Sequence, residues 1–281
     1  MFLKKLTILA VILCSFFGLS NNTRAETRLI LGISPDYNTF DPGHAYEIWA
    51  TTVLNVTYDN LVKFEGLNDV PQLDAAKSRS ASGDGLTWTF KLRDDIYFVS
   101  GNKLTSADVK WSFDRVKHLK GNPAFLAANV EAVSVPDKHT VVIKLVNTDS
   151  SFISKLATPA FAILDSKTVK AMGGATGKGA DKKDTVKAGL NQLSAGSGPY
   201  ILKSFVPDSE VILVKNKNYR KKVPGADRIH LRSMPDGNSQ LLAIQKGDID
   251  IAFNSIITIK HNVYLYYIRY KIYKAQNSQD L

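Results

Sequence analysis

The stretch FVSGNKLTSADVKWSF, residues 98–113, combines a turn, a helix start and one face of a buried helix. Thr105 is followed three residues later by Asp108, which predicts a capping box: each side chain satisfies a free backbone N–H of the first helical turn. Val109, Phe113 and Val116 then recur at positions 0, 4 and 7. This spacing places their side chains on one face of a helix. The stretch therefore predicts a capped helix packed on a hydrophobic core.

Strands are predicted on both sides of this helix. Leu86, Trp88, Phe90 and Leu92 follow a Gly-Asp-Gly turn and alternate with polar residues, so they line one side of a half-buried strand. Residues 131–145 are typical of a hairpin that turns at Pro-Asp-Lys. Further strands are predicted at residues 27–34, 198–202, 211–214 and 249–253. The mixture of strands and helices favours an α/β protein.

Two other helical stretches are predicted, and one long loop. Ile48, Thr52 and Asn55 share one helical face, and a second helix starts at Asn238 and leads into the last strand. Residues 171–187 lack an apolar period and predict an exposed loop or the approach to a short helix. Its glycine run, residues 173–179, is not a phosphate-binding P-loop, because that motif needs four residues between its glycines and a Ser or Thr after the lysine.

The first 25 residues have the pattern of a secretory signal peptide. Lys4 and Lys5 precede an apolar run over residues 6–19, which is too short to span a bilayer. Thr23 and Ala25 then supply the small residues that a signal peptidase accepts. We expect cleavage after Ala25 and export to the periplasm.

The single cysteine, Cys14, lies inside this apolar run. Leu13 precedes it, whereas lipoprotein processing requires a small residue at that place, so lipidation of Cys14 is the weaker alternative. The mature chain is then free of cysteine and of disulfides. Its stability must come from a large apolar core.

The net charge of +10 is distributed along the whole chain. Residues 1–25 carry +3 and residues 255–281 another +3, which leaves +4 for the rest. The remaining basic residues alternate with acidic ones and form no stripe with aromatic residues between them. Nucleic-acid binding is therefore not expected.

Residues 255–281 differ in composition from the preceding chain. Five of the eleven tyrosines lie there, and glycine, proline and glutamate are absent from this segment. This change indicates an aberrant tail, such as the product of a frameshift. The alternative is a pair of terminal strands, since Ile, Tyr and Val are good strand formers.

Residue patterns for enzyme chemistry or metal binding are not found. The five histidines are scattered, with no pair at metal-ligand spacing. Asp248 and Asp250 are two residues apart, but nothing near them in the sequence is typical of a nucleophile or a base, so they are interpreted as marking the end of a strand. We expect neither an enzyme nor a cofactor.

An ordered series of segments resembles the family 5 extracellular solute-binding proteins, the peptide and nickel group. The most specific is FVSGNKLTSADVKWSF at residues 98–113. The others are, in order, FDP at 40–42, YDNLV at 58–62, PQL at 71–73, DGLTWTFKLR at 84–93, GSGPY at 196–200, NKNY at 216–219 and GDID at 247–250. The similarity extends over about residues 27–253.

The resemblance implies a fold and a partner. The fold would be α/β, periplasmic binding protein type II-like, with mixed sheets and flanking helices. Residues 26–254 would be mainly the first, N-terminal lobe, with the second lobe missing. In the family a peptide or other small solute binds between two lobes, and the closed protein, a monomer, docks on an ABC permease of the inner membrane driven by an ATPase.

The resemblance also suggests ligand-binding residues. Asp36, Tyr37 and Asn38 follow the first predicted strand, from which relatives present residues to the cleft, and Tyr46 is a neighbour. Asp36 and Asn38 have an equally good alternative role in building the turn. One lobe alone is expected to bind peptide weakly or not at all. The alternative function is a non-binding fragment or a module that docks on the permease.

Overall fold

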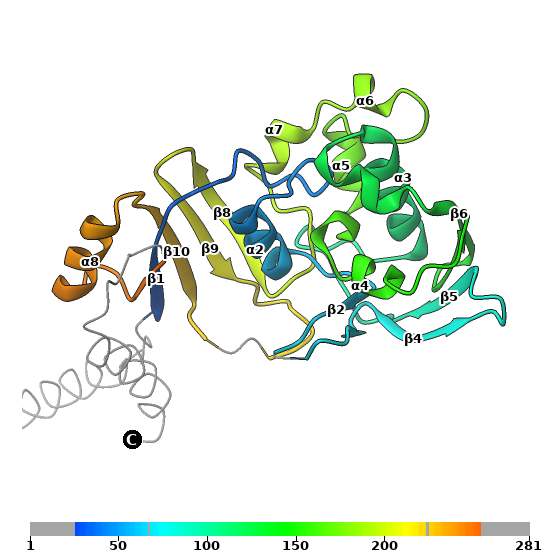
Figure 1. Ribbon diagram of the computed structural model, residues 1–281, viewed down its shortest axis with the longest axis horizontal. Helices are drawn as coiled ribbons and strands as arrows, with labels where there is room; N and C mark the ends of the chain where they lie inside the picture. The colour runs from blue at the N-terminus through cyan, green and yellow to red at the C-terminus, as the bar shows by residue number, and fades with distance from the viewer. Residues whose placement is uncertain (1–25, 67, 223–224, 254–281) are drawn as a thin grey trace, which may run out of the picture.

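Two β-sheets with helices packed on them make up the fold (Figure 1). The computed structural model describes residues 26–66, 68–222 and 225–253. The predicted signal peptide and the predicted aberrant tail, residues 1–25 and 255–281, lie outside the described residues. The larger sheet has five strands in the order β11-β1-β10-β9-β8, and the smaller has four in the order β4-β5-β7-β6. A short pair, β2 and β3, lies between β1 and β4 in the sequence.

The five-stranded sheet is mixed. β1 pairs in parallel with β10 and with β11, whereas β10 pairs with β9, and β9 with β8, in antiparallel fashion. Leu31 of β1 lies opposite Leu231 of β10, and both are buried. The strands are β1 (Arg28–Ile33), β8 (Tyr200–Val206), β9 (Glu210–Lys215), β10 (Arg228–Ser233) and β11 (Ile251–Ala252). The mixed α/β prediction is confirmed.

The four-stranded sheet is antiparallel throughout. It contains both the half-buried strand predicted around Trp88 and the predicted hairpin, whose strands are β6 and β7. The strands are β4 (Ala76–Ala81), β5 (Thr87–Leu92), β6 (Val130–Asp137) and β7 (Thr140–Leu145), and the short pair is β2 (Val62–Lys63) with β3 (Gln72–Leu73). Phe90 and Leu92 are completely buried, as their alternation predicts.

The helices lie on these sheets and between them. They are α2 (Ile48–Thr57), α3 (Ser106–Leu119), α4 (Phe152–Leu156), α5 (Ser166–Ala171), α6 (Ala180–Lys183), α7 (Lys187–Leu190) and α8 (Gly237–Lys246), with the 3-10 turns η1 (Asn122–Ala127) and η2 (Pro159–Phe161). Residues 171–187 are loop apart from the very short helix α6, and they lead into α7, in agreement with the prediction. Among the described residues no helix is long and apolar enough to cross a membrane.

Helix α3 begins as the sequence predicts and joins the two halves of the core. The Asp108 carboxylate accepts hydrogen bonds from the backbone N–H of Thr105 at 2.9 Å and from the Ser166 hydroxyl at 2.7 Å. Val109 and Phe113 are buried in the cluster around the four-stranded sheet. Trp111 is buried in the cluster around the five-stranded sheet. Helix α3 therefore contributes side chains to both hydrophobic clusters.

Asp248 and Asp250 precede β11, which is shorter than the predicted strand. The Asp250 carboxylate accepts a hydrogen bond of 2.8 Å from the backbone N–H of Ile30, and the Asp250 N–H donates to the Ile30 carbonyl. Asp250 thereby attaches the entry of β11 to β1. The interpretation of this pair as marking a strand end agrees with the structure.

Candidate functional site

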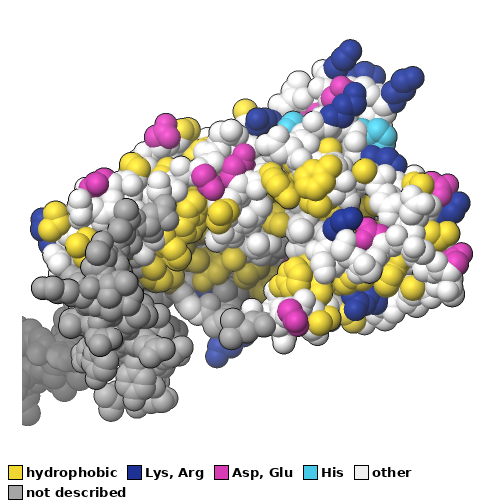
Figure 2. Space-filling model, in the orientation of Figure 1, with side chains coloured by type: hydrophobic (Ala, Val, Ile, Leu, Met, Phe, Trp, Pro, Cys, Tyr) yellow, Lys and Arg dark blue, Asp and Glu magenta, His cyan; other side chains and the backbone are white. Residues whose placement is uncertain are grey.

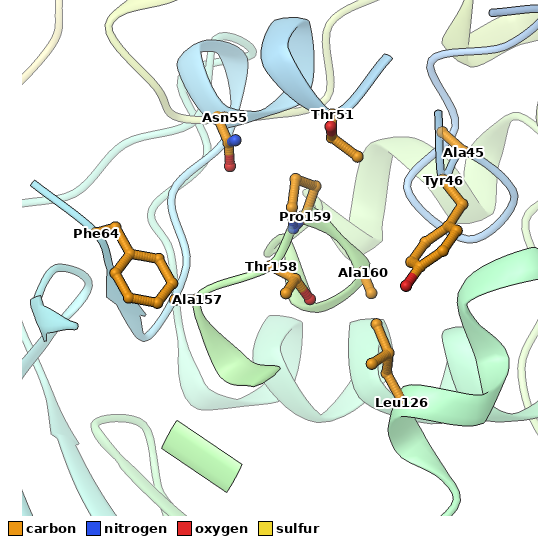
Figure 3. Close-up of a pocket in the computed structure, with 10 residues that line it drawn as sticks. All are labelled: Ala45, Tyr46, Thr51, Asn55, Phe64, Leu126, Ala157, Thr158, Pro159 and Ala160. Carbon is orange, nitrogen blue, oxygen red and sulfur yellow. The ribbon is translucent and has the colours of Figure 1, made fainter. Parts of the chain in front are cut away.

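A pocket of about 320 Å³ opens between the start of α2 and the turn η2 (Figure 3). Residues from four separate segments line it, so that only the folded chain brings them together. The lining residues are Ala45, Tyr46, Thr51, Asn55, Phe64, Leu126, Ala157, Thr158, Pro159 and Ala160. Tyr46 and Phe64 stand on opposite sides of it in Figure 3.

The floor of the pocket is held in place by Asn60. Its side-chain amide is buried and donates hydrogen bonds to the carbonyls of Leu156 and Thr158, at 2.9 and 2.7 Å. The Thr158 carbonyl also accepts the backbone N–H of Phe161 at 3.0 Å, so the Asn60 amide links this turn to the Leu156 carbonyl. Asn60 thus fixes the backbone that leads into η2.

One wall comes from α2. Thr51 and Asn55 are four residues apart, so they share a face of the helix, and both side chains point toward η2 in Figure 3. The hydroxyls of Thr51 and Thr158 donate to the carbonyls of Ile48 and Lys155, at 2.9 and 2.7 Å. Their oxygen lone pairs stay available as acceptors, while the Asn55 amide offers both donors and an acceptor.

Apart from these groups and the Tyr46 phenol, the lining is apolar. None of the described residues in it has a charged side chain. Such a surface binds a solute by apolar contact and by a few oriented hydrogen bonds. The part of the chain that the structure describes contains no group of three or more His, Cys, Asp or Glu that could hold a metal ion. The arrangement therefore suits the binding of a small organic molecule.

Of the four residues proposed from the sequence, Tyr46 lines this pocket. Its side chain is 52% exposed and meets Phe125 edge to face, with ring centroids 5.5 Å apart. Asn38 is exposed on the loop before α2. Tyr46 is therefore the one predicted residue that is placed to touch a molecule in the pocket.

Asp36 and Tyr37 have structural partners. The two carboxylate oxygens of Asp36 accept hydrogen bonds from the backbone N–H groups of Ile48 and Trp49, at 3.1 and 3.2 Å, so they cap α2. The Tyr37 ring packs on Phe40 and Phe205, at 5.0 and 5.7 Å between centroids. Burial, with the nearby Asp36 charge as a smaller cause, raises the pKa of Tyr37 to about 12. A contact of either residue with a solute stays a prediction.

Most of the lining was not predicted from the sequence. The spacing of Thr51 and Asn55 is a usable signal, because it places two polar residues on one face of α2. No comparable signal marks Phe64, Leu126 or Thr158, since they come from turns and short segments that meet only in three dimensions.

Next to Asn60 in the sequence, Asp59 shares a buried cluster with Asp74 and Arg220. The Arg220 guanidinium binds both carboxylates, and the Lys63 ammonium lies 3.3 Å from Asp74. Burial, together with the Asp74 charge, raises the pKa of Asp59 above its usual range, and the Arg220 charge opposes this shift. Two acids and two bases leave the cluster balanced in charge, so it can be buried.

Two glycines bring the segment at residues 196–200 against the end of α2. A Cβ on Gly196 would lie 2.1 Å from the Thr57 carbonyl oxygen, and one on Gly198 2.6 Å from the Thr57 carbonyl carbon. Only glycine permits so close an approach. The Ser197 hydroxyl between them donates a 2.9 Å hydrogen bond to Asp59.

Comparison with known proteins shows to which family the sequence motifs of this chain belong. Residues 70–276 match the family model described as bacterial extracellular solute-binding proteins, family 5 Middle. The chain is 30% identical over 251 residues to the probable D,D-dipeptide-binding periplasmic protein DdpA of Escherichia coli K12, covering 88% of this chain and 47% of DdpA. It is 26% identical over 230 residues to the nickel-binding periplasmic protein of the same strain, covering 81% of this chain and 41% of the relative.

Solved structures show the same likeness. A structure of MoaA from A. tumefaciens R10 in complex with mannopinic acid superposes with a TM-score of 0.71 at 27% identity, covering 81% of this chain and 45% of MoaA. This chain thus spans about half the length of the relatives that it matches, with a partial periplasmic-binding-protein fold. The family consists of solute-binding proteins, which confirms the expectation that the chain is not an enzyme. The family match covers most of the chain, and the chain belongs to the family 5 bacterial extracellular solute-binding proteins.

Proposed function

We propose that this chain provides one wall of the solute-binding cleft in the periplasmic component of an ABC importer for peptides or similar small solutes. The observation that carries the proposal is the pocket beside α2, lined by Tyr46, Asn55 and Thr158. Membership of a solute-binding family supports a solute as its occupant.

The chemistry of the pocket favours a neutral part of a solute. A peptide backbone presents N–H and C=O groups, which the Asn55 amide and the threonine oxygens complement. Apolar contact with Phe64 and Leu126 suits a short side chain. The relatives named for a D,D-dipeptide and for mannopinic acid agree with a small organic solute that carries polar groups.

The affinity of this wall alone should be low. A cleft that closes on a solute binds it from two sides, and the closed form gains stability only from the contacts of both sides. One wall desolvates few groups, yet association still costs roughly 4 to 15 kcal/mol of lost freedom. We therefore expect millimolar or weaker binding to the chain as it stands.

Chemical-shift perturbation in solution tests the proposal, because it detects weak binding and locates it. The probes are a D,D-dipeptide, an L,L-dipeptide and mannopinic acid. We expect shifts at Tyr46, Asn55 and Thr158, and their loss in Tyr46→Ala. Tyr97→Ala is the matched control, since Tyr97 is 48% exposed and lies outside the pocket lining.

Two results would count against the proposal. If no probe shifts the resonances of the pocket residues, this pocket is not the solute site. The same holds if the shifts persist unchanged in Tyr46→Ala. Micromolar binding measured by calorimetry would contradict the low affinity of a single wall.

A further inference from the structure

Six exposed lysines gather on one end of the molecule, over α5, α6 and α7. Figure 2 shows Lys and Arg side chains concentrated at the top of the molecule, where Figure 1 places α6 and α7. We call this group the lysine patch. It consists of Lys167, Lys170, Lys178, Lys182, Lys183 and Lys187, all exposed. The six lysines lie within residues 167–187 of the sequence. The patch was not predicted, because Asp181 and Asp184 lie among these lysines in the sequence.

The loop between α5 and α7 is folded back on itself. The Thr185 N–H donates to the Gly173 carbonyl at 3.2 Å, and the Ala175 N–H donates to the Asp184 carboxylate at 2.8 Å. These bonds hold the lysines on either side of the loop on one surface. The patch is therefore a fixed feature of the fold.

The acidic residues within this region already have partners. Asp184 binds the Arg115 guanidinium at 2.8 Å, and Arg115 also binds Asp41, with all three side chains buried. Asp181 pairs with Lys120 at 3.0 Å. Within the described residues, no hydrogen bond or ion pair is found for the side chains of four lysines of the patch: Lys178, Lys182, Lys183 and Lys187. Their charge is thus directed to solvent without compensation.

The composition of the patch indicates which kind of polyanion fits it best. Among the described residues, no large hydrophobic side chain is exposed between positions 167 and 187. Protein interfaces need an apolar core and are depleted in lysine, and nucleic-acid sites use arginine forks or aromatic platforms. Flexible lysines without an apolar anchor suit a diffuse layer of anionic lipid headgroups, where each lysine near the surface contributes favourably.

We propose that the lysine patch docks this protein on the surface of a membrane that contains anionic phospholipids. Binding is electrostatic and peripheral, with α6 and α7 facing the headgroups. Because the contact is between exposed charges, it weakens as salt shortens the Debye length. This interaction is separate from solute binding and does not depend on the pocket.

Vesicle co-sedimentation tests the proposal with the full chain. The probes are phosphatidylcholine vesicles with and without phosphatidylglycerol, at low and at physiological ionic strength. The patch variant is K178Q/K182Q/K183Q/K187Q. The matched control removes the same charge elsewhere, in K77Q/K138Q/K203Q/K217Q, where all four lysines are exposed. Thermal melts followed by circular dichroism check that both variants are as stable as the parent protein.

We expect binding to phosphatidylglycerol vesicles that decreases with salt. The patch variant should partition at least about tenfold more weakly than the control variant, given the contribution of each lysine. Both variants keep the basic residues of segments 1–25 and 255–281, so the difference between them reports on the patch alone.

The proposal fails if both variants bind equally, if phosphatidylcholine alone binds as well, or if the parent protein does not bind anionic vesicles. Patch-dependent retention of a polynucleotide without binding to vesicles would assign the patch to nucleic acid and would equally overturn it.

Discussion

The guanidinium of Arg220 lies 3.2 Å from a carboxylate oxygen of Asp59, and both side chains are almost completely buried. Arg220 also binds Asp74, so one side chain joins three parts of the chain. Asp59 lies in the segment 58–62 and Asp74 follows the segment 71–73, both of which carry the family resemblance. The family motifs therefore meet in one buried charged cluster.

Replacement of Arg220 by methionine should be strongly destabilising. Methionine fills similar space but leaves Asp59 and Asp74 buried with only Lys63 to balance them. Removal of one partner from a buried ion pair typically costs about 3 to 5 kcal/mol. Urea unfolding should show a loss of this size in the free energy of unfolding.

The neighbouring lysine offers a matched control. Lys221 pairs with Glu65 at 3.0 Å, but both side chains are 47% exposed. An exposed pair contributes roughly 0 to 1 kcal/mol, so Lys221→Met should change stability little. Equal losses in the two variants would show that the buried cluster has no special role.

Gly196→Ala should also destabilise the protein. The added methyl group would lie 2.1 Å from the Thr57 carbonyl oxygen, so the backbone must shift. Overpacking of this kind costs typically about 1 to 3 kcal/mol. Gly83→Ala is the control, because a Cβ there meets nothing within 4 Å. A melting temperature that falls in Gly196→Ala but not in Gly83→Ala would agree with the close approach. Equal melting temperatures of the two variants would contradict it.

Acid unfolding should depend on Asp227. Its carboxylate accepts hydrogen bonds from the Thr27 N–H and hydroxyl and from Lys215, which lower its pKa to about 2. As the pH falls, the unfolded state takes up the proton first, near pH 4, and the native state does so only near pH 2. The contribution of Asp227 is therefore complete above about pH 4 and is lost between about pH 4 and pH 2.

Asp227→Asn should consequently show a smaller loss of stability between pH 6 and pH 3 than the parent protein. The measurement is the urea midpoint at each pH. Asp248→Asn is the control, because the Asp248 carboxylate is exposed and makes no hydrogen bond to the described residues. If the acid dependence of Asp227→Asn equals that of the parent, the hydrogen bonds of Asp227 do not lower its pKa.

Elements with a strong local pattern could be predicted from the sequence. The start of α3 follows from Thr105 and Asp108, and β5 from its alternating apolar residues. Strands β4 and β10 were not predicted. In β4 only Ala76 is buried, so its sequence has no alternation to detect. In β10 the apolar residues Ile229 and Leu231 alternate with basic ones, but only Leu231 is buried, and the alternation is too short to stand out.

The site was less predictable than the fold. Tyr46 was placed near the cleft from the family resemblance, but the opposite wall comes from Phe64, Leu126 and the turn at Thr158. These segments are distant in sequence, and their approach depends on hydrogen bonds such as those of Asn60. Local sequence patterns do not predict such contacts. The lysine patch differs, because its residues lie within one short stretch, 167–187, and only the pairing of Asp181 and Asp184 with other residues required the structure.

Asp36 allows the two roles considered for it to be separated. Both carboxylate oxygens accept backbone N–H groups at the start of α2. Asp36→Ala removes this cap and should lower the free energy of unfolding by about 1 kcal/mol. Asp36→Asn keeps an oxygen acceptor and should cost less, because Asn is as good a cap as Asp. If the Asp36 charge also meets a solute, the asparagine variant will lose peptide-dependent shifts at unchanged melting temperature. If only the alanine variant differs from the parent, and only in stability, Asp36 caps α2 and does not contact the solute. Tyr46 is then the first residue in the sequence that lines the proposed solute site.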